Sequence, residues 1–129
     1  MLNRKVILID MEEIKLFDSE LKVMEIVWAN EPVSAKQISA IATETIGWNK
    51  NTTYTIIKKL IEKNCIKRSE PKFMCSSLVS KSIIQRTETD TLIDKLYQGS
   101  RQAFFASFLQ SGSLSEKEIS ELRDLIDRK

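Results

Sequence analysis

The sequence predicts a mainly α-helical fold, with three helices and a β-hairpin followed by a helical C-terminal region. The 129 residues include only three glycines and two prolines, which favours long helices over many tight turns. Apolar residues recur with helical spacing along most of the chain, whereas the segment around residues 65–76, like the apolar run at residues 5–9, has the short runs typical of strands. At 42% hydrophobic and 29% charged, the composition is that of a globular protein.

The first predicted helix spans residues 18–30. Asp18 is the expected N-cap, and apolar residues follow it with roughly helical spacing until Pro32 ends the pattern. Residues 1–12 are expected to form an N-terminal extension, and residues 13–77 a compact domain.

The second and third predicted helices follow closely. Ser34 and Gln37, three residues apart, form a capping box that opens a helix ending near Gly47. After a polar break at residues 49–51, a third helix is expected to end at Asn64, a residue that tolerates a left-handed conformation. Its apolar face has the spacing i, i+3, i+4, i+7, in Thr53, Ile56, Ile57 and Leu60.

A β-hairpin is predicted next. Runs at residues 65–68 and 73–76 flank a proline-containing turn at residues 69–72. Cys65 and Cys75 would then lie on opposite strands, and direct opposition would permit a disulfide and hence a redox switch. The alternative is that both are small, partly buried hydrophobic residues.

Residues 78–129 are expected to form a helical dimerisation region. Such a short helical segment buries its large apolar side chains poorly by itself, so a second copy of the chain is the simplest cover. The residues predicted to lie in this homodimer interface are Leu92, Leu96, Phe104, Phe105, Phe108, Leu122, Leu125 and Ile126.

Three helices followed by a hairpin is the order of a winged helix-turn-helix domain. If the third helix turns its apolar face inward, its other face offers hydroxyl, amide, phenol and cationic groups to the major groove of DNA. Residues 49–72 carry seven basic and two acidic side chains, a local charge of +5 against +2 for the whole chain. The predicted DNA-binding residues are Lys50, Asn51, Thr52, Tyr54, Thr55, Lys58, Lys59, Arg68 and Lys72. The alternative function is a winged-helix module that binds protein and not DNA.

Other classes of function lack support in the sequence. The chain has no histidine, the commonest general base and metal ligand, and its three scattered glycines form no phosphate-binding loop. We therefore expect no enzyme activity, no cofactor and no metal. No apolar run approaches the length of a membrane span, no signal peptide is evident, and two cysteines are too few for a disulfide scaffold. These features predict a cytoplasmic protein without membrane insertion.

Three segments carry a resemblance to a known family, at residues 16–28, 48–55 and 115–125. With them, the chain from about Glu13 to Lys129 resembles the penicillinase and methicillin-resistance repressor family. The resemblance implies a homodimer on a palindromic promoter operator, controlling β-lactamase or other antibiotic-resistance genes. It also implies base contacts at the start of the third helix, with Lys50 and Lys58 nearer to phosphates. The residues in the base-contact positions are Asn51, Thr52 and Tyr54.

The chain departs from the family pattern in three respects. Family members often carry a basic residue where this chain has Asn51 or Tyr54. The best-known members are induced when a membrane sensor protease pathway cleaves an Asn-Phe bond, and the nearest match here is Ser107-Phe108. The copper-responsive relatives use a cysteine-rich C-terminal motif, but this chain has no cysteine after Cys75.

Overall fold

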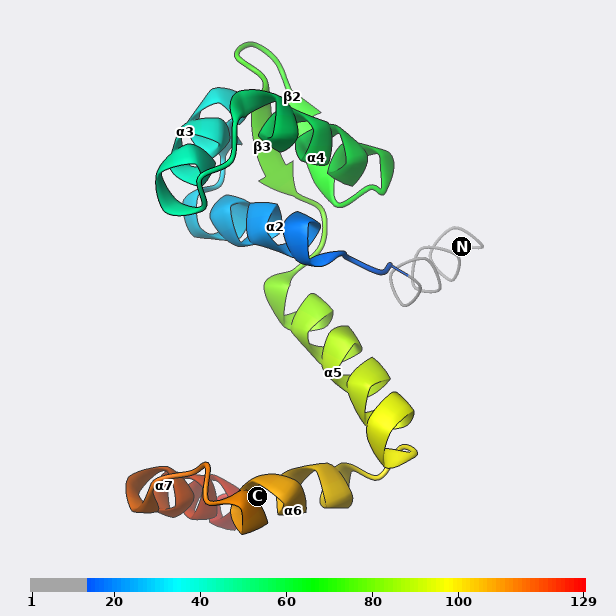
Figure 1. The fold of residues 1–129 in the computed structure, drawn as a ribbon, viewed down its shortest axis with the longest axis vertical. Coiled ribbons are helices and arrows are strands. Elements are labelled where there is room, and N and C mark those ends of the chain that lie inside the picture. The colour runs from blue at the N-terminus through cyan, green and yellow to red at the C-terminus, as the bar shows by residue number, and fades with distance from the viewer. Residues whose placement is uncertain (1–13) are drawn as a thin grey trace. The chain divides into compact units, whose positions relative to one another are not determined.

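The structure is a computed structural model that describes residues 14–129, so the predicted extension at residues 1–12 lies outside it. The described residues form six helices and three strands (Figure 1). The chain divides into two compact units between Thr87 and Glu88, within helix α5 (Lys81–Tyr97). In chain order the elements are α2 (Asp18–Asn30), β1 (Val33–Ser34), α3 (Ala35–Thr45), α4 (Lys50–Glu62), β2 (Ile66–Ser69), β3 (Met74–Ser77), α5 (Lys81–Tyr97), α6 (Arg101–Ser111) and α7 (Glu116–Asp127).

The first unit is a winged helix-turn-helix, as predicted. Helix α2 contacts α3, α4 and β3, and α4 also contacts β2, so the sheet closes one side of the three-helix core (Figure 1). Trp28 lies beside this core and donates a hydrogen bond from its indole Nε1 to the Val79 carbonyl (3.0 Å). The fully buried side chains include Val23, Met24, Val27, Ile38, Ala42, Ile57, Leu60 and Cys75.

Side-chain caps set where the helices begin. The Ser34–Gln37 capping box is present. The Ser34 hydroxyl accepts a hydrogen bond from the backbone amide of Gln37, and the side-chain Oε1 of Gln37 accepts one from the backbone amide of Ser34, both at 3.1 Å. At α4, Asn49 Oδ1 accepts from the Thr52 amide at 2.8 Å. Because Asn49 is the N-cap, the polar break predicted at residues 49–51 ends at Asn49, and α4 already includes Lys50.

The N-cap of α2 is Phe17, so the prediction of Asp18 was wrong by one residue. The Phe17 backbone amide donates to Glu20 Oε1 at 2.8 Å. The carboxylate of Glu20, three residues after Phe17, thus satisfies the backbone amide of the N-cap residue, although Phe17 has no polar side chain to mark the helix start.

The hairpin, called the wing from here on, lies one residue later than predicted. The Asn64 backbone is left-handed (φ 61°), and the Cys65 amide still bonds to the Leu60 carbonyl at 2.9 Å, so Cys65 belongs to the helix exit and not to β2. A strand that was not predicted, β1, pairs antiparallel with β3, giving the order β1-β3-β2.

The two cysteines are not opposed, so the condition for the proposed disulfide fails. In the ladder Cys75 faces Arg68, and Cys65 precedes β2 and bonds through its carbonyl to the Leu78 amide. Both thiols are free and buried. Burial raises the pKa of Cys65 and raises that of Cys75 to about 11, so both thiols stay protonated at neutral pH.

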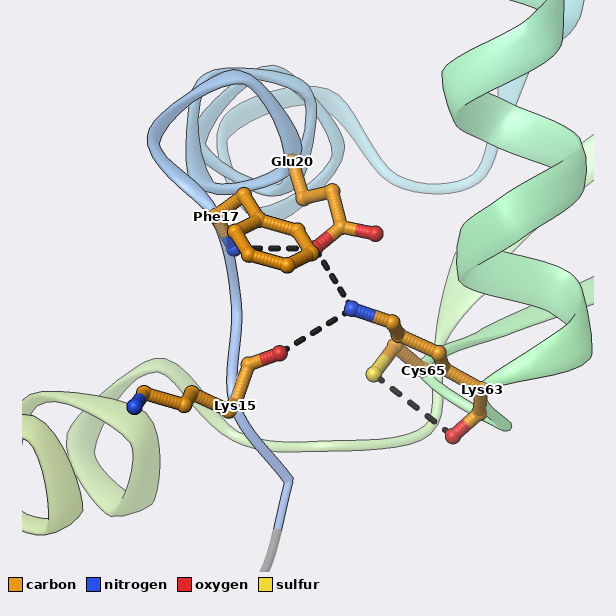
Figure 2. Close-up of polar contacts among 5 residues, drawn as sticks. All are labelled: Lys15, Phe17, Glu20, Lys63 and Cys65. Carbon is orange, nitrogen blue, oxygen red and sulfur yellow. Dashed lines mark hydrogen bonds and ion pairs between the residues drawn. The ribbon is translucent and has the colours of Figure 1, made fainter.

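A buried ion pair joins the start of α2 to the end of α4 (Figure 2). The Glu20 side chain is 2% exposed, and its Oε1 also accepts from Lys63 Nζ at 2.7 Å. The same Nζ donates to the Lys15 carbonyl at 3.0 Å and lies 4.7 Å from the centroid of the Phe17 ring. Glu20 Oε2 is buried and accepts no hydrogen bond from residues 14–129, so Lys63 is the main compensation for this carboxylate.

The second unit contains residues 88–129 of the helical region predicted at 78–129. Phe104 makes edge-to-face contacts with Tyr97, Phe105 and Phe108, at centroid distances of 5.6, 5.4 and 5.2 Å. The Tyr97 hydroxyl donates to Ser107 Oγ at 3.1 Å, which ties α5 to α6. The predicted capping box at Ser115 opens α7, with Glu118 as its partner.

We expect Glu20→Ala to lower the free energy of unfolding by about 1–3 kcal/mol, because the Phe17 amide loses its acceptor and the Lys63 ammonium loses its carboxylate partner, keeping only the Lys15 carbonyl and the Phe17 ring. Glu25→Ala, which breaks the exposed pair with Lys81 (3.1 Å), should cost less than about 1 kcal/mol. Urea unfolding of both variants gives the comparison. Equal losses of unfolding free energy would show that the Glu20–Lys63 pair stabilises the fold no more than the exposed Glu25–Lys81 pair does.

Both cysteines should resist a thiol reagent in the folded protein at pH 8, because few thiolates form and burial limits access. After unfolding in urea, two thiols per chain should react quickly. Following the colour released by an aromatic disulfide reagent measures both rates. An intramolecular disulfide formed in the folded protein under oxidising conditions would contradict the strand register described above.

Candidate nucleic-acid interface

Helix α4 turns its apolar face inward, as its spacing predicted. Thr53, Ile56, Ile57 and Leu60 are all buried against the other helices and the sheet. The opposite face therefore remains at the surface of the unit (Figure 1). Six of the predicted DNA-binding residues are exposed there: Lys50, Asn51, Thr52, Thr55, Lys58 and Lys59.

One flank of this face borders a shallow open groove with a volume of about 520 Å³. The groove lies between the start of α2 and the first turns of α4, and its wall carries hydroxyl, amide and ammonium groups. Ser19, which was not among the predicted site residues, contributes from α2; only the folding of the chain brings it to α4. The lining residues are Ser19, Trp48, Asn49, Asn51, Thr52, Thr55, Ile56 and Lys59.

The other flank of α4 faces the wing. Tyr54 was predicted to be exposed, but it is half-buried, because its ring meets that of Phe73 edge-on at a centroid distance of 6.0 Å. Lys50 Nζ lies 5.6 Å from the Tyr54 ring centroid, and the Arg68 guanidinium carbon 3.6 Å from that of Phe73. Phe73 was not among the predicted site residues either, since a turn phenylalanine has no local signal for this role.

The basic residues of this region differ in how far they are neutralised. Lys63 pairs with Glu20, and Arg68 Nε donates to the carboxylate of Glu70, which lowers the Glu70 pKa. Within residues 14–129 no carboxylate lies in ion-pair distance of the remaining five cations. These are Lys50, Lys58, Lys59, Lys67 and Lys72, so uncompensated positive charge gathers on α4 and the wing.

No cluster of three or more metal-ligating side chains occurs among residues 14–129. None of the helices described there is both long and apolar enough to cross a bilayer.

The predicted dimer residues lie on α5, α6 and α7. Phe104 is half-buried within the ring cluster, and the other seven are at least 40% exposed, up to 71% for Ile126. The candidate cleavage bond between Ser107 and Phe108 lies inside α6, where the Ser107 hydroxyl donates to the Phe104 carbonyl at 2.6 Å.

Similar proteins were found by sequence and by structure. The penicillinase repressor of Staphylococcus aureus is 30% identical over 118 residues, which cover 90% of this chain and 94% of that protein. The methicillin resistance regulatory protein MecI of Mammaliicoccus sciuri is 30% identical over 122 residues, covering 93% and 99%. The solution structure of the DNA-binding domain of the repressor BlaI superposes with a TM-score of 0.50 at 21% identity, covering 54% of this chain and 87% of that domain, which shows a shared fold.

The family model described as penicillinase repressor matches residues 16–128, which is nearly the whole chain. The match includes all three segments on which the resemblance was based, and it extends through both units of the structure. The chain therefore belongs to the penicillinase repressor family.

Proposed function

We propose that this protein represses transcription by binding, as a homodimer, to a palindromic promoter operator. The observation that carries the proposal is the exposed face of α4, where polar groups lie at the capped helix start and the lysines along the helix pair with no carboxylate of residues 14–129. Lys50, Lys58 and Lys59 are the proposed phosphate contacts on this face, and Asn51, Thr52 and Thr55 the proposed base-edge contacts.

The second unit supports the homodimer. Apolar side chains on three helices are left at its surface, with Leu96 58%, Phe105 61% and Ile126 71% exposed. A surface of this kind is typical of a protein interface. A twofold dimer would place one α4 on each half-site, roughly one helical turn of DNA or a multiple of it apart.

The names of the relatives suggest which genes are controlled. They are repressors of penicillinase and regulators of methicillin resistance, so we propose that this chain controls β-lactamase or other antibiotic-resistance genes, and acts in the cytoplasm. We do not extend the proposal to proteolytic induction or a sensor protease. Ser107 stands where the family bond has asparagine, and the bond lies within a hydrogen-bonded helix.

Footprinting on the DNA upstream of the protein's own gene tests the proposal. We expect one or more protected regions with inverted symmetry, and an apparent affinity that falls steeply as salt is raised. If no fragment is protected, the alternative of a protein-binding winged helix takes the place of DNA binding.

The same assay tests the lysines of α4. Lys50→Ala with Lys58→Ala should weaken operator binding, and should lower the slope of log Kd against log salt by about one for each phosphate that the variant no longer neutralises. Lys117→Ala, on the exposed surface of α7, is the matched control and should leave both quantities unchanged. An unaltered salt slope in the double variant would remove these lysines from the interface.

The dimer is tested by Leu125→Asp with Ile126→Asp, which places two carboxylates on the exposed apolar surface of α7. Because burying a charge without a partner is costly, we expect a monomer in sedimentation equilibrium and much weaker operator binding. Glu121→Ala on the same helix is the control and should remain dimeric. A double variant that sediments as wild type would place the interface elsewhere.

A further inference from the structure

Four side chains, two from α4 and two from the wing, form one continuous series of contacts. Lys50 lies over the Tyr54 ring, Tyr54 meets Phe73 edge-on with an interplanar angle of 84°, and Arg68 lies over the Phe73 ring. We call these residues (Lys50, Tyr54, Phe73 and Arg68) the wing brace. Cation–ring and edge-to-face contacts have defined geometry, so the brace relates the wing to α4 in direction as well as in distance.

The backbone at the wing turn shows how firmly Phe73 is held. Phe73 and its neighbour Lys72 both have positive φ angles, 50° and 73°, a region that bulky side chains rarely adopt. Such a conformation persists only where the surroundings determine it. Here the Phe73 carbonyl accepts from the Ala35 amide at 2.9 Å, while its ring lies between Tyr54 and Arg68. One residue is therefore fixed by α3, α4 and β2 together.

The contacts of the brace also limit what two of its members, Tyr54 and Arg68, can do for DNA. The Arg68 guanidinium contacts both the Phe73 ring and the Glu70 carboxylate. Lys72, next to Phe73 in the turn, is exposed and pairs with no carboxylate of residues 14–129. The Tyr54 ring is half-buried, and it stands where family members often carry a basic residue. Both side chains are thus committed to contacts within the domain.

We infer that Tyr54, Phe73 and Arg68 are positioning residues, which hold Lys72 of the wing at a fixed position relative to the exposed face of α4. This inference rests on the proposed function, and it replaces the sequence-based prediction that Tyr54 and Arg68 contact DNA directly. Tyr54 and Arg68 act on DNA through the wing, and the direct contacts come from the exposed residues of α4 and from Lys72.

Matched substitutions separate positioning from direct contact. Tyr54→Phe keeps the ring and removes the phenol, so operator affinity should stay within about twofold of wild type. Tyr54→Leu and Phe73→Leu remove a ring and should each weaken binding roughly three- to tenfold. Arg68→Lys keeps the charge but loses the planar group, and should weaken binding to a similar degree. A large loss in Tyr54→Phe, or full activity of Arg68→Lys and Phe73→Leu, would overturn the inference.

A double-mutant cycle gives a readout that a general loss of stability does not produce. Lys72→Ala should weaken binding in the wild type but have less than half that effect, on a logarithmic scale, once Phe73→Leu has released the wing. Lys58→Ala, on α4, is the control and should have the same effect in both backgrounds. Equal effects of Lys72→Ala in the two backgrounds would overturn the inference even if every variant folds normally.

A measurement without DNA distinguishes failure of the brace from failure of the proposed function. The side-chain protons of Arg68, which lie over the Phe73 ring, should show upfield NMR shifts that disappear in Phe73→Leu. Absence of these shifts in the wild type would refute the brace itself. If the shifts are present but the protein binds no operator, the brace exists, while the proposed DNA binding and the positioning role that rests on it are refuted.

Discussion

The structure depends on the burial of one stripe of side chains on α4. Thr53, Ile56, Ile57 and Leu60 close the core against α2, α3 and the sheet, and this fixes the rotation of α4 about its own axis. A rotation that exposed this stripe would return several large apolar side chains to water, at about 1.5–3 kcal/mol each. The outward direction of Lys58 and Asn51 is therefore a consequence of packing, and needs no partner to maintain it.

The two ends of α4 are held by polar groups. Asn49 caps its first turn, and Lys63, just beyond its last turn, reaches the buried carboxylate of Glu20 on α2 (Figure 2). Packing thus controls rotation, the Lys63–Glu20 contact limits sliding of α4 along its axis, and the Asn49 cap fixes where the helix begins. Together they present one face of a short helix in a single orientation, which recognition of a regular surface such as a DNA groove requires.

Much of the fold could be predicted from the sequence, because helices and caps are local. The spacing of Ile56, Ile57 and Leu60, and the Ser34–Gln37 and Ser115–Glu118 pairs, identified elements that the structure contains. The missed strand β1 exists only because β3, distant in sequence, arrives beside it. The other errors were shifts of one residue at helix ends: Glu20 satisfies the amide of Phe17, and the Cys65 amide still bonds to the Leu60 carbonyl. For the site, the exposed face of α4 followed from periodicity, but Ser19 and Phe73 join it only through the tertiary fold.

The order of the strands has a consequence for solubility. Strand β2 forms an outer edge of the sheet, and an edge strand offers free backbone groups with which another chain can pair. Lys67 and Arg68 occupy the middle of β2, and both are exposed. The charge of Lys67, which pairs with no carboxylate of residues 14–129, repels an identical strand from another molecule, whereas the charge of Arg68 is shared with Glu70. The wing is thereby protected from edge-to-edge aggregation by the same kind of charge that would attract a polyanion.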